Sequence, residues 1–496
     1  MANYLKKALF GVGYVFVFSL FGMFAAYLFR LLVARNLSTE QFGLFYAVFS
    51  LVTSIHLFRD PGLKYALIKF IPEFVVKGAY EKINKMVSMT FFTWTVVAVL
   101  FSAVTIFFAK FLSDVYFKSG DAFWLIVVLS VAFVLILDYV ISYAFQGFQK
   151  MAFFSSVDAL RSLLLLAVAF IGFSFSPGVL VPAFAYLIVP VILSIVYFPI
   201  LKFKVFKGFA LFSPFDSHLL RKMVYFGLPV TITGISYSLF QQSGVLILTY
   251  FDSLSEVALL NIALPTSALI INLASSILYV IFPLSSELWA LGYKKHLEEG
   301  INLLYRYSFM AIIPVSLVMF SFSELLINLF FGEKYAGASL ALMVLSIGSI
   351  FWVISNINFS FLAGIGRSKE PLKIMMAIGL FGILLNFALI PFFGLMGAVW
   401  SIVIGYFLAL VFSLVMLKKY VEVHMPIMFW FRNILVGLIF LGSIYAIKGF
   451  LVVKNAYLEA IITLIGASAI YVIFLFLLRM TSVQELMHYL GRAIKK

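Results

Sequence analysis

Long apolar stretches separated by short polar segments make up most of the chain. Each stretch runs for roughly 20 residues, the length that a helix needs to cross about 30 Å of hydrocarbon. The pattern therefore predicts an all-α polytopic membrane protein with about fourteen spanning helices. The predicted spans are 9–35, 41–58, 87–110, 121–146, 156–175, 178–201, 221–250, 257–283, 303–330, 335–362, 373–392, 394–417, 427–450 and 456–479.

Composition excludes a water-soluble core as the explanation of this pattern. Hydrophobic residues make up 64% of the chain and charged residues only 11%, whereas soluble domains carry about 25% charged residues. The first apolar stretch is too long for a signal peptide and lacks a small-residue cleavage pattern, so we expect a retained first helix.

The distribution of basic residues predicts the orientation. The net charge is +15, but the Lys and Arg residues are spread over many interhelical segments, which argues against a nucleic-acid partner. With the N-terminus inside, only seven of the 35 fall on the outer side: Arg30, Arg35, Lys110, Lys118, Lys334, Lys448 and Lys454. The positive-inside rule thus places both termini in the cytoplasm, with the protein in the cell membrane. The basic, amphipathic segment 59–85 should lie along the inner surface.

An internal repeat is indicated by three pairs of short segments with nearly the same spacing. The segments that begin at Leu37 and Leu254, and those around Gly147 and Gly364, lie 217 residues apart, and those around Gly178 and Gly394 lie 216 apart. This spacing covers six spans and predicts a six-helix lobe at 1–208, a second lobe at 209–425, and two extra helices with a cytoplasmic tail at 426–496. Parallel repeats of this size are typical of carriers with a central cleft; the alternative is that the duplication reflects fold history only.

Several short motifs carry a family resemblance. They include the run from Arg30 to Leu44 (RLLVARNLSTEQFGL), the tetrapeptide 60–63 (DPGL), the tripeptide 227–229 (GLP) and the segment 364–367 (GIGR) followed by Pro371. In order and spacing, over roughly residues 9–417, the chain resembles the polysaccharide biosynthesis/export proteins of the multidrug/oligosaccharidyl-lipid/polysaccharide exporter superfamily.

The resemblance implies a fold and a function. The fold would be two six-helix lobes that form a V, plus two additional helices. The function would be flipping of a polyisoprenyl-(pyro)phosphate-linked oligosaccharide from the cytoplasmic to the outer leaflet, for surface polysaccharide or glycan assembly. Lipid II flippases carry an arginine about five residues before a proline in span 8, but Leu260 stands at that position before Pro265. This departure argues against a peptidoglycan precursor as the substrate.

Three arginines are candidate ligands for the anionic head group. Arginine stays charged and donates paired hydrogen bonds to phosphate, and a charge within a span suggests function. Arg30 matches a cavity arginine of the lipid II flippases, and Arg59 could contact the phosphate on entry. Arg35 lies closer to the surface. The alternative for Arg30 and Arg35 is snorkelling to the interface; for Arg59 it is positive-inside anchoring or a pair with Asp60.

Polar residues inside other spans are candidates for a cavity lining or for ion coupling. Asp138 in span 4 could couple protons or Na⁺, or pair with a basic residue of a neighbouring helix. Gln241 and Gln242 stand mid-span 7, where many relatives carry an acid, and could bond across helices or contact sugar hydroxyls.

Two asparagines complete the set of candidates. Asn356 fits a role in bonding between helices. Asn386 matches a residue that contributes to cation binding in some relatives, but Ile390 replaces the acid expected one turn later. This replacement argues against a Na⁺ site at Asn386. Whether transport is coupled to H⁺ or Na⁺, or driven by downstream consumption of the product, stays open.

The sequence shows no sign of an enzyme, a metal site or a cofactor. Cysteine is absent, the five histidines are scattered, and no phosphate-binding glycine-rich loop appears. A cation-coupled multidrug antiporter is one alternative function, although span 1 offers Arg30 instead of an acid. A membrane glycan polymerase or ligase is the second, but every predicted outer loop is short. We expect a monomer in the lipid bilayer, with glycan polymerases or transferases as compatible partners.

Overall fold

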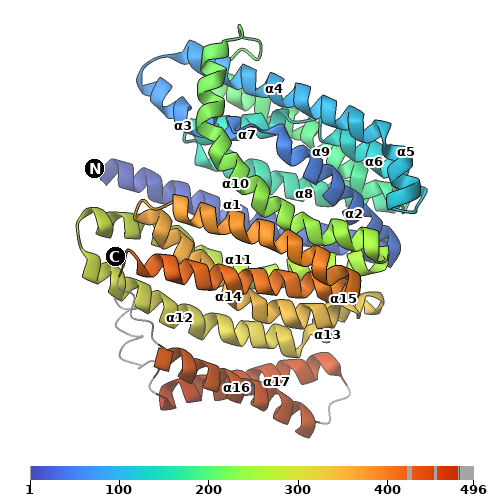
Figure 1. Cartoon of the computed structure of the whole chain (residues 1–496), viewed down its shortest axis with the longest axis vertical. Helices are drawn as coiled ribbons and strands as arrows, with labels where there is room; N and C mark the ends of the chain where they lie inside the picture. Colours follow the sequence, from blue (N-terminus) through green and yellow to red (C-terminus); the bar gives the residue numbers. More distant parts are fainter. Residues whose placement is uncertain (1, 422–426, 452–454, 479, 481–496) are drawn as a thin grey trace. The chain divides into compact units, whose positions relative to one another are not determined.

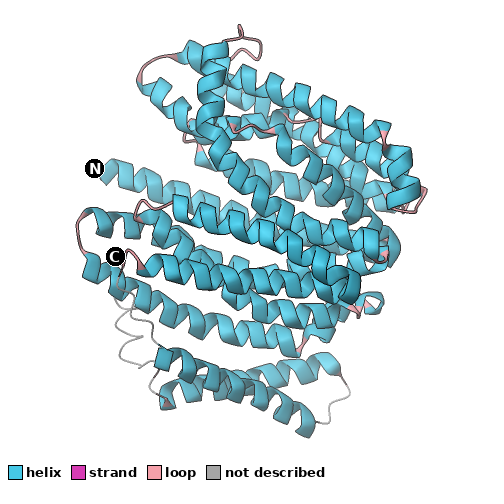
Figure 2. Cartoon of the chain, in the orientation of Figure 1, coloured by secondary structure: helices cyan, strands magenta, loops and turns pink. Residues whose placement is uncertain are grey.

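The computed structural model describes residues 2–421, 427–451, 455–478 and 480. All regular elements in these ranges are helical (Figures 1 and 2). The predicted C-terminal tail beyond residue 480 lies outside them. The first elements are α1 (Ala2–Asn36), α2 (Thr39–His56), η1 (Leu57–Arg59), α3 (Leu63–Val76), α4 (Tyr80–Phe107), α5 (Ala109–Phe111), η2 (Leu112–Tyr116), α6 (Asp121–Ala132), α7 (Leu137–Gly147), α8 (Met151–Phe175), α9 (Leu180–Pro199) and η3 (Ile200–Val205).

The remaining elements include the longest helices of the chain. They are α10 (Ser217–Phe251), α11 (Leu254–Ala290), α12 (Lys294–Ser321), α13 (Ser323–Phe330), η4 (Glu333–Tyr335), α14 (Ala338–Gly364), α15 (Lys369–Lys418), α16 (Ile427–Phe450) and α17 (Ala456–Leu477).

The predicted number of spans is confirmed. Thirteen helical segments of the described chain are long and apolar enough to cross a membrane. One of them, α15, has 50 residues and is interrupted at Gly394, where φ is 52° and ψ is −130°. This backbone conformation suits glycine and divides α15 into two spans at the boundary predicted between 392 and 394. The chain is therefore a multi-pass membrane protein with about fourteen spans.

Two predicted spans are not continuous helices. The span expected at 121–146 is broken between α6 and α7, and the span expected at 303–330 is broken at Phe322, between α12 and α13. At the second break, the Lys448 side chain donates to the carbonyl of Ser321 (3.3 Å) and lies over the Phe322 ring. A helix end leaves carbonyls without intrahelical partners, and this lysine satisfies one of them.

The amphipathic segment after Arg59 forms α3, which is too short to count among the spans. Its apolar positions, such as Leu67 and Phe70, are buried, while the Lys69 side chain pairs with Glu73 at 3.6 Å. This arrangement agrees with an amphipathic helix; its predicted place at the inner membrane surface stays a prediction.

The contacts divide the chain into two compact units. Unit 1 comprises Met1–Asn261 and Met375–Ala398, and unit 2 comprises Ile262–Ile374 and Val399–Lys496. This grouping by contact differs from the predicted lobes 1–208 and 209–425, because α10 and the start of α11 group with unit 1. The predicted lobes come from an internal sequence repeat, which a grouping by contact does not test. The duplication therefore stays a prediction.

In unit 1, glycines let α10 and α11 touch the backbone of earlier elements. A Cβ atom on Gly227 of α10 would lie 1.9 Å from the carbonyl oxygen of Gly62, which precedes α3 and has φ +101°. A Cβ atom on Gly43 of α2 would lie 1.8 Å from the carbonyl oxygen of Leu254. Side chains at Gly43 and Gly227 would therefore force these helices apart.

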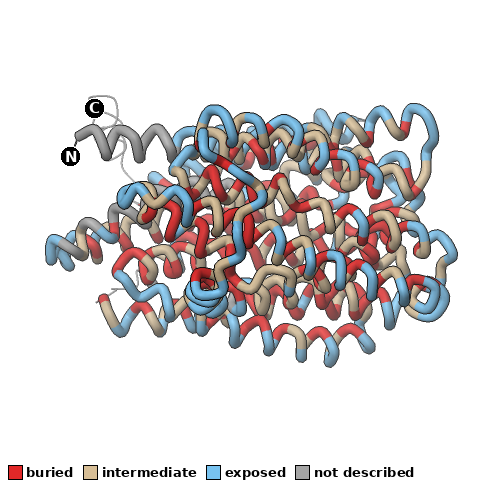
Figure 3. The backbone as a smooth tube through the Cα atoms, turned by 90° about the horizontal axis from the view of Figure 1, so that it is seen from above, coloured by how far each residue is buried: buried red, intermediate tan, exposed pale blue. Residues whose placement is uncertain are grey.

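Unit 2 has two apolar clusters, and both include residues of α12. One joins α12 to α14 and the end of α15, with Tyr305 and Ile354 fully buried. The other joins α12 and α13 to the pair α16 and α17, around Phe440. Buried positions recur along the helices between exposed ones (Figure 3), as expected for helices that face protein on one side and lipid on the other.

Candidate functional site

Arg30 lies on α1, where a main-chain carbonyl and an aromatic ring hold its guanidinium group. Its guanidinium donates to the carbonyl oxygen of Asn261 and lies 4.2 Å from the centroid of the Tyr46 ring on α2. Among the described residues, no ion pair to Arg30 is formed. A carbonyl and an aromatic face stabilise a cation but leave its positive charge uncompensated.

Arg59 ends η1 and is held in the same way. Its Nη1 donates to the carbonyl oxygen of Phe133 at 3.0 Å, and its guanidinium carbon lies 5.5 Å from the Trp94 ring and 5.9 Å from the Tyr139 ring. Its Nε atom is buried and has no hydrogen-bond partner in the described part of the chain. The neighbouring Asp60 forms no ion pair with Arg59 among the described residues: its Oδ1 accepts from the backbone N–H groups of Gly62 and Leu63 and from Nε1 of Trp94.

A small cavity adjoins Arg59. It measures about 50 Å³ and is lined by Arg59, Ala132, Phe133, Leu135, Tyr139, Tyr186 and Pro190. Three of these residues belong to or border the break between α6 and α7. Discontinuous spanning helices often line substrate or ion sites in transporters. The volume suits a few water molecules, so a phosphate group would require the walls to move.

The break between α6 and α7 exposes carbonyls that other helices satisfy. Helix α6 ends at Ala132 and α7 begins at Leu137. Ser102 of α4 donates to the carbonyl of Ser130 at 2.7 Å, and Arg59 donates to that of Phe133. The chain between the helices, Phe-Val-Leu-Ile at 133–136, contains neither glycine nor proline. Sequence reasoning therefore could not find this break.

Asp138 is fully buried in the first turn of α7 and forms an ion pair. Its Oδ2 accepts from Arg161 of α8 at 2.8 Å, and Arg161 also pairs with Asp158 on its own helix. The Arg161 guanidinium lies 4.1 Å from the centroid of the Tyr139 ring. Of the two predicted roles, the structure shows the pairing with a basic residue of a neighbouring helix.

The other candidate residues of unit 1 make no contact with Arg30 or Arg59 in the hydrogen bonds that follow. Gln241 donates to the hydroxyl of Tyr237 at 2.7 Å, and its neighbour Gln242 is half-buried. Asn386 is fully buried and donates to the hydroxyl of Ser243 at 2.9 Å, so it links α15 to α10. Arg35, in the last turn of α1, is exposed.

Asn356 belongs to unit 2, and its side chain donates to the carbonyl of Trp352 on its own helix at 3.0 Å. This hydrogen bond lies within α14. No group of three or more His, Asp or Glu residues that could hold a metal ion occurs within the described ranges.

Aromatic side chains of unit 1 connect the surroundings of Arg30 with those of Arg59. Tyr46, beneath Arg30, lies 6.5 Å from Phe49, and Phe49 lies 4.8 Å from Tyr186, which lines the Arg59 cavity. Tyr46 and Arg59 are thirteen positions apart on α2 and η1, or roughly 20 Å at the rise of a helix. Sequence reasoning missed the aromatic residues of this path, because phenylalanine and tyrosine are common throughout the chain.

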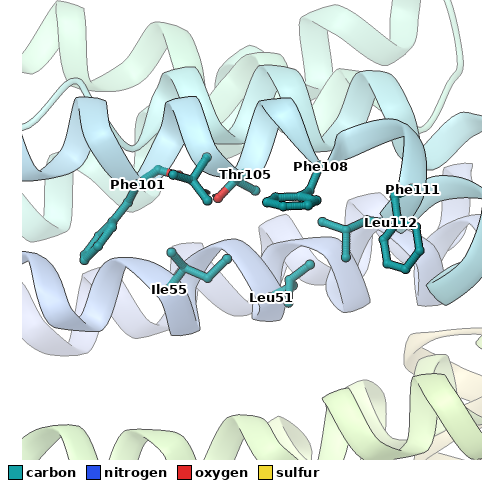
Figure 4. Close-up of a pocket in the computed structure, with 8 residues that line it drawn as sticks. Leu51, Ile55, Phe101, Thr105, Phe108, Phe111 and Leu112 are labelled. Atoms are coloured by element: carbon teal, nitrogen blue, oxygen red, sulfur yellow. Dashed lines mark hydrogen bonds between the residues drawn. The ribbon is translucent and has the colours of Figure 1, made fainter.

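A larger hollow of unit 1 lies between α2 and α4 and is apolar (Figure 4). It measures about 410 Å³ and is lined by Leu51, Ile55, Phe101, Val104, Thr105, Phe108, Phe111 and Leu112. The Thr105 hydroxyl, its one polar side-chain group, donates to the carbonyl of Phe101. These walls carry no cationic side chain, so the hollow does not fit a phosphate.

Solved structures with the same fold are transporters and a flippase. The lipid II flippase MurJ, in an inward closed conformation, matches with a TM-score of 0.74 and 17% identity over 92% of this chain and 97% of that one. An inward-facing multidrug resistance MATE family transporter matches with a TM-score of 0.65 and 16% identity, over 81% and 94%. A transporter of the same superfamily from Pyrococcus furiosus, described as having a binding pocket of reverse polarity, matches with a TM-score of 0.59 and 16% identity, over 83% and 95%.

Sequence comparison assigns the family. An uncharacterized membrane protein of Methanocaldococcus jannaschii is 29% identical over the full length of both chains. Residues 8–289 match the family model described as polysaccharide biosynthesis protein. Because this match covers more than half of the sequence, the chain belongs to the polysaccharide biosynthesis protein family.

Proposed function

We propose that this protein flips a polyisoprenyl-(pyro)phosphate-linked oligosaccharide from the cytoplasmic to the outer leaflet by alternating access. The proposal rests on the hydrogen-bond partners of Arg30 and Arg59. Both lie in or at the end of apolar spans, and both donate to a main-chain carbonyl instead of a carboxylate. A charge in a span is costly and is usually functional, and an uncompensated cation in such a place suits an anionic ligand.

Binding of a phosphate at Arg59 would be an exchange of acceptors. The Nη1 group of Arg59 now donates to the neutral carbonyl of Phe133, and Nε has no partner among the described residues. A charge-assisted bond to phosphate is roughly twice as strong as a bond between neutral groups. The exchange is therefore favourable, provided that the small cavity at the α6–α7 break opens.

The aromatic path between the two arginines supports a glycan as part of the cargo. Phe49 and Tyr186 lie between the surroundings of Arg30 and those of Arg59. Aromatic faces combine apolar area with a negative quadrupole and can stack against the C–H faces of sugar rings. A head group that moves between the two arginines would pass along such faces.

A cation-coupled multidrug antiporter is disfavoured by the state of Asp138. Such a carrier needs a carboxylate that can exchange a coupling ion or bind a cationic drug. The carboxylate of Asp138 is instead occupied by Arg161 at 2.8 Å. The proposal places both termini in the cytoplasm and Arg59 on the cytoplasmic side, where it meets the substrate first, with glycan polymerases or transferases as downstream partners.

The test combines lipid identification with transport. Purified protein is analysed by mass spectrometry for copurified lipids, and translocation of a fluorescent polyprenyl-pyrophosphate glycan is measured in proteoliposomes. We expect a polyprenyl-(pyro)phosphate sugar in the lipid extract. Arg30→Ala and Arg59→Gln should each lower the translocation rate about tenfold, the order of loss of one charge-assisted contact.

The matched control is Arg221→Gln, which removes an exposed arginine at the start of α10 and should leave transport unchanged. Reproducible absence of such lipids, together with drug-stimulated transport of an organic cation, would contradict the proposal and favour the antiporter. Normal transport by Arg30→Ala would remove Arg30 from the head-group site.

A further inference from the structure

A second half-buried arginine, Arg161, lies near Arg59, and both guanidinium groups contact the ring of Tyr139. The guanidinium carbon of Arg161 lies 4.1 Å from the centroid of the Tyr139 ring, and that of Arg59 lies 5.9 Å from the same centroid. The two distances together limit the separation of the two cations to about 10 Å. Arg59 donates only to a neutral carbonyl, whereas Arg161 pairs with two carboxylates.

The two carboxylates around Arg161 are not equivalent. The Asp138 side chain has no exposed surface, while that of Asp158 is 60% exposed. Water and salt screen an exposed charge far more than a buried one. Asp138 is therefore the principal counter-charge of Arg161, whereas Arg59, which contacts the same Tyr139 ring, forms no ion pair among the described residues.

We propose that Asp138 sets how tightly Arg59 holds an anionic lipid head group. By pairing with Arg161 beside Tyr139, Asp138 lowers the positive charge of the site and leaves Arg59 as the cation that can bind the head group. The head group can then bind and also leave, which a carrier needs. This inference rests on the proposed function and makes Asp138 and Arg161 positioning residues that act on the head group through the charge at Arg59.

A charge-setting role gives opposite effects for the two members of the pair. Asp138→Asn leaves Arg161 with its exposed partner only, so the site gains positive charge. Arg161→Gln leaves the buried negative charge of Asp138, so the site loses positive charge. A structural role would instead weaken binding in both variants, because both disturb the same contact.

The experiment measures the Kd of farnesyl pyrophosphate, a short polyisoprenyl pyrophosphate, for the full-length protein in nanodiscs. At low salt we expect Asp138→Asn to lower the Kd about 3- to 10-fold and Arg161→Gln to raise it by a similar factor. These factors follow from a unit charge about 10 Å away in a medium of intermediate dielectric, reduced by screening. The double variant Asp138→Asn/Arg161→Gln should return close to the wild-type Kd.

Two further variants keep the test decisive. Asp158→Asn removes the exposed partner of Arg161 and leaves the ion pair between Asp138 and Arg161 in place. It should lower the Kd less than twofold at low salt, with no effect at high salt. In an Arg59→Gln background, Asp138→Asn should no longer tighten binding. Thermal unfolding of each variant identifies any that fail to fold, in which case Asp158→Asn and the double variant carry the comparison.

The outcomes separate this inference from the proposed function. No binding of farnesyl pyrophosphate by the wild type would contradict the proposed function itself. Binding by the wild type, with weaker binding in both Asp138→Asn and Arg161→Gln, would overturn this inference alone. If Asp138→Asn still lowers the Kd in the Arg59→Gln background, the inference is also overturned, because Asp138 would then act on the ligand without Arg59.

Discussion

The two units join their central helices with different polar contacts. In unit 1, the buried contact between α7 and α8 is ionic and involves Asp138 and Arg161. In unit 2, the buried contacts among α12, α14 and α15 are neutral: Tyr305 donates to the amide oxygen of Asn358, whose nitrogen donates to Ser413 at 2.8 Å. Neutral bonds between spanning helices contribute little each, whereas buried ion pairs often stabilise no better than apolar residues would. We infer that the neutral contacts of unit 2 serve helix packing, whereas the charges of unit 1 serve the candidate head-group site.

The largest expected effect is on the ionic cluster. Arg161→Gln leaves the carboxylate of Asp138 buried without its cationic partner, and should lower the free energy of unfolding by about 3–5 kcal/mol. Unfolding by SDS titration in detergent micelles measures the change. Arg432→Gln, at an exposed position of α16, is the control and should have no measurable effect. A loss below about 1 kcal/mol in Arg161→Gln would mean that the two units do not differ in this respect.

The neutral cluster should respond less. Asn358→Ala leaves the hydroxyl groups of Tyr305 and Ser413 without their shared partner and should cost about 2 kcal/mol in the same unfolding assay. Asn356→Ala is the matched control on the same helix, because the bond that the Asn356 side chain makes among the described residues lies within α14; its cost should stay below about 0.5 kcal/mol. Equal losses for the two asparagines would show that the link between helices adds nothing.

Removing one hydroxyl from the neutral cluster should cost still less. Tyr305→Phe keeps the ring in its apolar cluster and removes one hydrogen bond to Asn358, which corresponds to about 1 kcal/mol. Thermal unfolding followed by fluorescence can resolve it. Tyr445→Phe, at an exposed ring of α16, provides the baseline.

The smallest expected change in stability is that of a variant that lacks both charges of the buried ion pair. The double variant Asp138→Asn/Arg161→Gln removes both charges together and should lie within about 1 kcal/mol of the wild type in stability, because no isolated charge remains buried. Its stability is compared with that of Arg161→Gln alone in SDS titration. A double variant as unstable as Arg161→Gln would show that the ion pair itself stabilises unit 1. The polar contacts of both units would then serve stability, and the inferred difference between them would be wrong.

The apolar stretches and the polar or glycine-containing segments between them were enough to predict the number of spans. The apolar stretches gave their number, and Gly394 falls at the predicted boundary between two of them because a glycine there permits a backbone that other residues avoid. The breaks at 133–136 and at Phe322 could not be predicted. They depend on cations from distant segments, Arg59 and Lys448, that satisfy the freed carbonyls.

The candidate site was predicted in part. Intramembrane charges are conspicuous in an apolar chain, so Arg30, Arg59 and Asp138 could be singled out from the sequence. Which of them is neutralised depends on packing: Arg161 is 23 positions from its buried partner Asp138, and no local pattern reveals that contact. The residues that surround Arg59, Trp94 and Tyr139, are also distant in sequence.

The interruption of span 4 has an electrical consequence. The carboxyl end of a helix carries a partial negative charge and the amino end a partial positive one. Arg59 binds the carbonyl just beyond the end of α6, and Asp138 lies in the first turn of α7, so each charge faces a helix terminus of opposite sign. In a continuous helix these termini would vanish, and both side chains would lose this dipole stabilisation. The interruption is thus a polarised junction, in which the backbone itself holds a cation and an anion a few residues apart.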